Sequence, residues 1–171
     1  MRNIVFIGMP GAGKSTIGVV IAKIFGYSFV DADIKIQERE GDILEHLIEK
    51  NGIEGFLAIE NDVNLHIEGE RMVISTGGSA CYCEEAMRHY KEHDLVVYLQ
   101  LDLPEIQQRV GSLAKRGVVI HKGNTLRDLY EERTPLYEKY ADITVDLTGC
   151  QIHDSVKRTE KAIRACSKLY E

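Results

Sequence analysis

A glycine-rich run near the amino terminus, Gly8-Met9-Pro10-Gly11-Ala12-Gly13-Lys14-Ser15, has the spacing G-x-x-x-x-G-K-S of a phosphate-binding loop. Glycines let the backbone curl so that successive N–H groups point at phosphate oxygens. In such loops the lysine amine reaches the β- and γ-phosphates, and the serine hydroxyl ligates Mg²⁺. We therefore expect a nucleotide and Mg²⁺ to bind here, the nucleotide contacting Gly11, Ala12, Gly13, Lys14, Ser15 and Thr16.

Two carboxylates, Asp31 and Asp33, lie at the end of the expected strand 28–31. Residues two apart on an extended chain point the same way, so both should face the crevice at the carboxyl ends of the strands. One carboxylate could hold Mg²⁺, and the other could orient an attacking hydroxyl or accept its proton. The alternative is structural, in which the pair only ends the strand and caps the next helix.

A glycine turn and two arginines complete the set of candidate residues. Backbone amides at Gly77 and Gly78 could approach a ligand closely, because no side chains stand in the way. Arg116 lies in residues 111–124, a glycine-containing stretch without clear periodicity, which in a compact domain is either disordered or a functional, mobile lid. Arg133 lies in a helical pattern, where an isolated arginine is commonly a solvated surface charge.

The elements that must position these residues alternate between buried strands and helices. Short runs rich in Val and Ile predict strands at 4–7, 28–31, 72–75, 95–101 and 143–146. Helical patterns lie between them, at 14–25, 34–40, 43–50, 53–67, 84–90, 103–110, 126–140 and 152–169. The alternation predicts an α/β fold of three layers, α/β/α, with a five-stranded parallel sheet.

Size and composition indicate one domain, 1–171, with an ordinary globular core. The net charge of −6 argues against a nucleic-acid partner, and no apolar run approaches the ~20 residues of a membrane span. Cys81, Cys83, His89 and His93 could in principle bind zinc, but their spacing is not that of a zinc finger. We expect those four residues to be structural, and the protein to be a cytoplasmic monomer.

Taken together, these motifs resemble the shikimate kinase family, within the P-loop kinases that are similar to nucleoside-monophosphate kinases. The segments that carry the resemblance occur in the family's order: Gly8–Gly18, Asp31–Asp33, Thr76–Ala80, Val96–Leu99 and Arg133–Tyr137. The resemblance implies ATP-dependent transfer of a phosphate to a hydroxyl of shikimate or a similar small acceptor. It also implies a role in aromatic amino acid biosynthesis.

The resemblance also implies that residues 34–67 form a helical acceptor-binding region, and it gives roles to residues on the acceptor side. Asp33 would hold ring hydroxyls of the acceptor and assist proton removal, while Gly77 and Gly78 would line the pocket. Arg133 would bind the acceptor carboxylate. Arg116 would move with the lid toward the transferring phosphate.

On the nucleotide side, the resemblance implies that Asp31 supports Mg²⁺ together with Ser15. Arg109 would stack on the adenine, and the loop 148–152 would form the other wall of the adenine site.

Two acceptor-side positions depart from the family pattern. The family's Phe-Arg-x-x-Glu, whose arginine grips the carboxylate, reads Phe56-Leu57-Ala58-Ile59-Glu60 here. On a helical wheel Leu57 lies beside the core stripe, so we expect it to face the pocket, although it could simply extend the apolar edge next to Ile53. The third glycine of the turn is Ser79, whose side chain would stand where the acceptor lies.

Losing a charge-assisted hydrogen bond of about 1.5–3 kcal/mol weakens carboxylate binding by roughly 10- to 100-fold. Two alternatives to shikimate therefore stay open at this point. One is a kinase for a different acceptor, such as a cyclitol or a sugar acid, which the two departures favour. The other is a nucleotide-binding switch that no longer transfers phosphate.

Overall fold

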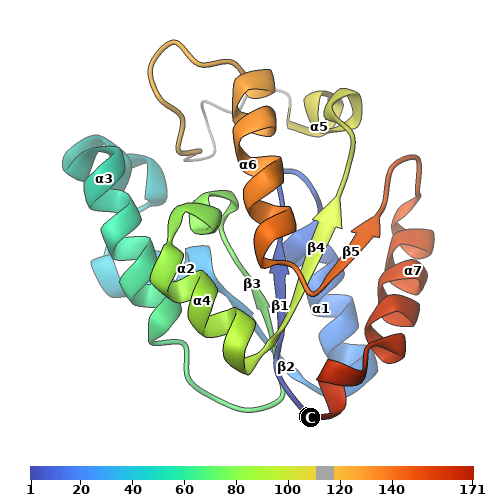
Figure 1. The fold of residues 1–171 in the computed structure, drawn as a ribbon. Coiled ribbons are helices and arrows are strands. Elements are labelled where there is room, and N and C mark those ends of the chain that lie inside the picture. Colours follow the sequence, from blue (N-terminus) through green and yellow to red (C-terminus); the bar gives the residue numbers. More distant parts are fainter. Residues whose placement is uncertain (111–117) are drawn as a thin grey trace.

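A computed structural model describes residues 1–110 and 118–171 and shows five parallel strands between two layers of helices (Figure 1). The strands are β1 (Ile4–Ile7), β2 (Ser28–Asp31), β3 (Met72–Ser75), β4 (Leu95–Gln100) and β5 (Ile143–Asp146). Their order in the sheet is β2-β3-β1-β4-β5. The predicted three-layer fold with a five-stranded parallel sheet is confirmed.

The helices cover both faces of the sheet, which is why the strands are apolar on both sides. In Figure 1, α1 (Lys14–Phe25) and α7 (Ile152–Ala165) lie on one face, and α4 (Glu84–His93) and α6 (Leu126–Tyr140) on the other. Beyond β2 and β3, α2 (Ala32–Glu40) packs against α3 (Leu44–Leu65). The short α5 (Leu103–Val110) follows β4. None of the described helices is both long and apolar enough to cross a bilayer.

Several of the predicted element bounds differ from the structure, and α2, for example, begins two residues earlier than expected, at Ala32. The two helices expected at 43–50 and 53–67 are joined in one helix, α3. This helix is kinked at Gly52, whose φ of 68° and ψ of 178° are not helical, so the chain turns where the gap between the two helices was expected. The helix expected to run to residue 169 ends at Ala165, and a short 3-10 turn, η3 (Ser167–Tyr170), follows. A second 3-10 turn, η1 (Gly78–Tyr82), was not predicted.

Because all five strands are parallel, their carboxyl ends meet at one edge of the sheet, where ligands of such folds bind. The core lies beneath this edge, and all four residues of β1 are fully buried. A smaller apolar cluster joins α2 and α3 to the chain after the undescribed residues, through Ile36, Leu47, Phe56, Val63 and Val119. The structure therefore seats residue 119 on the expected acceptor-binding region.

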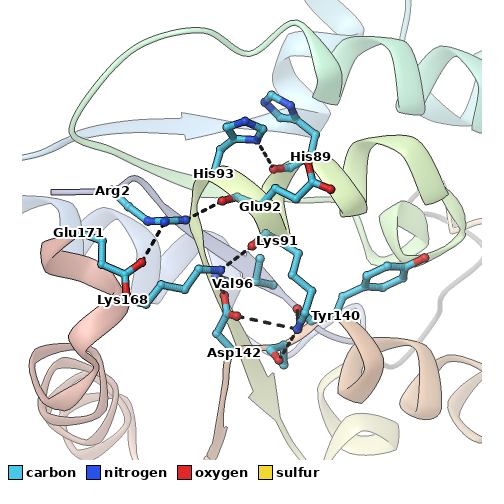
Figure 2. A network of polar contacts seen from close by, with 11 residues as sticks. Arg2, His89, Lys91, Glu92, His93, Val96, Tyr140, Asp142, Lys168 and Glu171 are labelled. Carbon is cyan, nitrogen blue, oxygen red and sulfur yellow. Dashed lines mark hydrogen bonds and ion pairs between the residues drawn. The ribbon is translucent and has the colours of Figure 1, made fainter.

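Polar contacts at the opposite edge of the sheet secure both chain ends (Figure 2). The Asp142 carboxylate accepts the Val96 N–H at 2.9 Å and the Lys168 amine at 2.6 Å. Arg2 pairs with Glu171 at 2.9 Å. These contacts lie at the amino ends of the strands, so they hold the C-terminal segment away from the edge where the candidate site is built.

Candidate active site

The phosphate-binding loop connects β1 to α1, as its spacing predicts. Gly8 has φ 145°, and a Cβ there would lie 2.6 Å from the Leu99 carbonyl oxygen, so only glycine fits. The Lys14 amine donates hydrogen bonds to the carbonyls of Gly8 at 2.8 Å and Met9 at 3.1 Å. Burial lowers the pKa of Lys14 to about 8, an effect that the nearby Asp33 carboxylate opposes. The lysine therefore stays mainly cationic at neutral pH.

Asp31 has two structural tasks at once. One carboxylate oxygen accepts the Ser15 hydroxyl at 2.6 Å, and this hydroxyl also lies 3.1 Å from the hydroxyl of Ser75. The other oxygen accepts the N–H groups of Asp33 at 3.0 Å and Ile34 at 3.4 Å, which caps α2. Asp31 therefore caps the helix, as the structural alternative predicted. It also forms a cluster of oxygen atoms with Ser15 and Ser75 next to the phosphate loop.

The predicted geometry of the Asp31 and Asp33 pair was wrong. The strand ends at Asp31 and α2 begins at Ala32, so the two aspartates do not alternate along an extended chain. Asp33 reaches the site from the first turn of the helix instead. Burial raises its pKa to about 6, with Asp31 acting in the same direction and Lys14 against it.

A cavity of about 380 Å³ joins the phosphate loop to the expected acceptor side. From the nucleotide set it is lined by Gly11, Gly13, Lys14, Ser15, Thr16 and Arg109. From the acceptor set it is lined by Asp33, Gly77, Gly78, Ser79 and Arg133. Ala12 is fully buried behind the loop. The structure thus brings most of the predicted residues to one cavity.

The glycine turn is needed for close approach. A Cβ on Gly77 would lie 2.5 Å from Glu60 Oε1 and 2.7 Å from Asp33 Oδ1. A Cβ on Gly78 would lie 2.8 Å from the ring of Pro10 and 3.0 Å from Arg133 Nη1. Since real Cβ atoms do not approach other atoms this closely, the carboxylates and the guanidinium occupy the space that these glycines leave free.

Arg133 is fully buried, contrary to the usual solvated surface arginine. Its Nη2 donates to the Val119 carbonyl at 2.6 Å, and its Nε donates to the Tyr82 hydroxyl at 3.4 Å. Nη1 has no hydrogen-bond partner among the described residues. A buried unpaired donor is costly, so a ligand that accepts a hydrogen bond from Nη1 is favoured at this point of the cavity.

Glu60, the glutamate that this chain retains from the family pattern, is a residue to which the sequence assigned no role. It is fully buried, and its Oε2 accepts the Ser79 hydroxyl at 2.6 Å. Burial raises the pKa of Glu60 to about 7. A usable signal was present in the sequence, because Phe56 and Val63 lie four residues before and three residues after it on one buried helix face.

Ser79 and Leu57 are placed differently from expectation. The Ser79 side chain is directed at Glu60 and only 6% of the residue is exposed, although it contributes to the cavity wall. Leu57 is half-buried, and it is not among the described residues that line the cavity. Phe56 and Leu44 supply the apolar wall instead.

A second cavity of about 630 Å³ lies between α5 and the loop 148–152, where the adenine was expected. Arg109 lines both cavities, and its guanidinium pairs with Glu105. The other Glu105 oxygen accepts the Gly149 N–H at 2.8 Å. Of the expected lid, Val118 and Val119 line the first cavity, and Arg116 lies outside the described residues.

The four residues weighed as zinc ligands have other contacts. The Cys81 and Cys83 thiols each donate to a backbone carbonyl at 3.6 Å, and burial raises the pKa of Cys81 to about 12. His89 and His93 stack on each other along α4. Within residues 1–110 and 118–171, no group of three or more His, Cys, Asp and Glu side chains is arranged as a metal site.

Comparison with known proteins places this geometry in a family. The family model described as shikimate kinase matches residues 10–164. Shikimate kinase from Pasteurella multocida is 36% identical over 148 residues, which span 84% of this chain and 85% of that protein. The enzyme from Methylococcus capsulatus is 34% identical over 170 residues, spanning 98% and 93% of the two chains.

Solved structures agree with the sequence relatives. A structure of shikimate kinase from Acinetobacter baumannii in complex with shikimate has a TM-score of 0.89 and 28% identity, covering 96% of this chain and 94% of that one. Thymidylate kinase from Candida albicans, at a TM-score of 0.63 and 15% identity, shares the fold. The family model, the relatives and the site together show that this chain belongs to the shikimate kinase family.

Proposed function

We propose that this chain transfers the γ-phosphoryl group of ATP to a hydroxyl of shikimate. The observation that carries the proposal is the shared cavity, in which the phosphate loop with Lys14 opens directly onto Asp33 and onto Arg133 Nη1, which has no hydrogen-bond partner within residues 1–110 and 118–171. A carboxylate oxygen of the acceptor would accept a hydrogen bond from Arg133 Nη1. Its ring hydroxyls would lie over the glycine turn, next to Asp33.

Phosphoryl transfer depends mostly on positioning and charge neutralisation, and the site provides both. Lys14 lies at the start of α1, where its cation and the helix N-terminus would both face the phosphates of a bound nucleotide. Asp33 would orient the attacking hydroxyl and take its proton. Its raised pKa, about 6, makes it a better proton acceptor than an ordinary aspartate while leaving it mainly ionised at neutral pH.

Mg²⁺ fits the oxygen donors that lie beside the phosphate loop. The ion prefers hard oxygen ligands and usually keeps several waters, and Ser15 and Asp31 present a hydroxyl and a carboxylate oxygen 2.6 Å apart. These two residues would hold the ion, which supplies neutralising charge to the phosphates. We propose adenine contacts for Arg109 and a phosphate contact for Arg116. We further propose a single cytoplasmic kinase domain that works as a monomer.

A second candidate is a kinase of the same family for another acceptor, such as a cyclitol or a sugar acid. Leu57 carries no charge, and Arg133 offers one unpaired nitrogen in the described part of the site, so the grip on a carboxylate is weaker than two arginines would give.

ADP formation measured with shikimate, quinate, inositols and gluconate separates the candidates. We expect shikimate to give the highest kcat/KM. A higher value for an inositol or gluconate would replace shikimate with that acceptor. No acceptor-dependent ADP with any of them, despite ATP binding, would instead support the non-catalytic switch.

A further inference from the structure

Glu60 has one carboxylate oxygen that is held and one that is free. Oε2 accepts the Ser79 hydroxyl at 2.6 Å, whereas Oε1 has no hydrogen-bond partner in the described part of the chain. The residue is fully buried. An unpaired buried polar atom typically costs about 1–3 kcal/mol, so a donor that reaches Oε1 is strongly favoured.

The unpaired oxygen of Glu60 lies next to Gly77, at the acceptor side of the cavity, although Glu60 itself is not among the described residues that line the cavity. The position of a Cβ on Gly77 would be 2.5 Å from Glu60 Oε1 and 2.7 Å from Asp33 Oδ1, so both oxygens converge on one point beside Gly77. Gly77 itself lines the cavity. Two acidic oxygens from different helices, α2 and α3, therefore lie next to this turn, and of the two residues Asp33 lines the cavity directly.

Few of the groups around Glu60 can satisfy it. Lys14 donates its hydrogen bonds to carbonyls of the phosphate loop, and Arg133 donates to Val119 and Tyr82. The other titratable groups that act on Glu60 or feel its charge are Asp33, Cys81, Cys83 and Tyr90. Among the residues that the structure describes, Ser79 is therefore the donor to the Glu60 carboxylate.

The Ser79 hydroxyl favours the ionised carboxylate. Burial raises the pKa of Glu60 to about 7, and the Ser79 hydrogen bond is the largest effect that opposes this rise. A serine at this point could instead obstruct the acceptor. However, its hydroxyl points toward Glu60 and the residue is almost completely buried, so the side chain does not project into the space of the acceptor.

We propose that Ser79 is a positioning residue, which holds the Glu60 carboxylate so that its free oxygen binds a hydroxyl of the acceptor. Glu60 and Asp33 then form a pair that grips neighbouring hydroxyls of one polyol ring. The site consequently selects its acceptor more by adjacent hydroxyls than by a second contact to an acid group. This inference rests on the proposed function, because it concerns the same cavity.

Three variants of Ser79 test the proposal, with shikimate as the acceptor. Ser79→Ala keeps the Cβ and removes the hydroxyl, and it should raise the KM for shikimate roughly tenfold while kcat and the KM for ATP change less than twofold. Ser79→Thr should restore the KM because it retains the hydroxyl. Ser79→Gly should behave like the alanine variant. If the glycine and alanine variants lower the KM, Ser79 obstructs the acceptor and the proposal is wrong.

A double-mutant cycle shows whether Ser79 acts through Glu60. In a Glu60→Gln background, Ser79→Ala should have little further effect on the KM for shikimate. Equal effects of Ser79→Ala in both backgrounds would overturn the link between the two residues. Circular dichroism and the melting temperature of each variant identify any that fail to fold, and the remaining variants still decide the question.

A titration that needs no turnover separates this inference from the proposed function. Carboxyl ¹³C NMR of the whole protein should show a higher pKa for Glu60 in Ser79→Ala than in the unmodified chain, because a hydrogen bond to the charged form is lost. An unchanged pKa overturns the positioning role. If the pKa rises but none of the acceptors is phosphorylated, the proposed function fails while the contact between Ser79 and Glu60 stands.

Discussion

The hydroxyl of Ser15 donates a hydrogen bond to Asp31 at 2.6 Å and so joins the first turn of α1 to the end of β2. The same carboxylate caps α2 through the N–H groups of Asp33 and Ile34. One side chain therefore serves the phosphate loop and also fixes the helix that carries Asp33. The two roles can be separated by substitution.

Asp31→Asn should keep the cap and lose the charge, whereas Asp31→Ala should lose both. Asparagine caps helices about as well as aspartate, and removal of a cap costs about 1 kcal/mol. We expect both variants to need roughly tenfold more Mg²⁺ for half-maximal ADP formation. The alanine variant alone should unfold at lower urea concentration. Equal stability of the two variants would contradict the capping role, and an unchanged Mg²⁺ requirement would contradict the metal role.

Lys14→Ala should reduce kcat by a factor on the order of 10³, because the amine stabilises charge on the transferring group. Lys23→Ala is the matched control, since Lys23 lies on the same helix with its side chain exposed. That control should keep the rate of the unmodified protein. Steady-state ADP formation at saturating ATP measures both. Normal turnover in Lys14→Ala would remove the phosphate loop from the mechanism.

Glu60 should make the protein less stable as the pH rises from about 4.5 to about 7. The pKa of Glu60 is about 7 in the folded chain and near its ordinary 4.5 when unfolded, so in this window the folded state retains a proton that the unfolded state has lost. The free energy of unfolding then falls with pH, by an amount on the order of 3 kcal/mol, and levels off above pH 7.

Glu60→Gln provides the reference, because it removes this titration and nearly preserves the shape. Urea unfolding of both proteins between pH 4 and pH 8 gives the difference in stability at each pH. Relative to the glutamine variant, the unmodified protein should lose stability as the pH rises. A difference that is constant with pH would show that Glu60 titrates normally in the folded chain.

Leu57→Arg should lower the KM for shikimate roughly tenfold, equivalent to about 1.4 kcal/mol. Residues three apart on a helix are neighbours, so the new guanidinium would lie beside Glu60 and could add a contact to the acceptor carboxylate. Ala58→Arg is the control, because Ala58 is the next residue of α3 and is exposed, so this substitution adds the same charge toward solvent. An equal fall in KM for an uncharged inositol would show that the gain does not come from the carboxylate.

The sequence predicted most of the fold because each strand is a short, continuous apolar run and the phosphate loop has a fixed spacing. Four of the five strands have the predicted bounds, and β4 ends one residue earlier, at Gln100. The turn at Gly52 was also expected as a gap between helices. Local pattern suffices for such features, because burial on both faces and glycine conformations leave a direct trace in residue type.

The site was harder to predict because its contacts join residues far apart in the chain. Asp33 was placed correctly in the cavity by a wrong argument, since the strand ends two residues before it. Glu60 was quoted only as the end of the Phe56–Glu60 pattern, and its burial follows from how its helix packs against η1 and α4. Ser79 was read as an obstruction, because the position of its partner Glu60 follows only from how α3 packs on the glycine turn.

The hydrogen bond from Arg133 Nη2 to the Val119 carbonyl occupies one of the two terminal nitrogens with which Arg133 could bind an acidic acceptor. An acceptor that takes a single contact leaves this bond in place, and the Val119 side chain keeps its seat among Phe56, Leu47 and Ile36. An acceptor that engages both terminal nitrogens must first displace that carbonyl. A bidentate contact between Arg133 and a carboxylate would therefore displace residue 119. Tighter binding of an acid thus comes at the expense of the packing of the protein's own chain over α2 and α3.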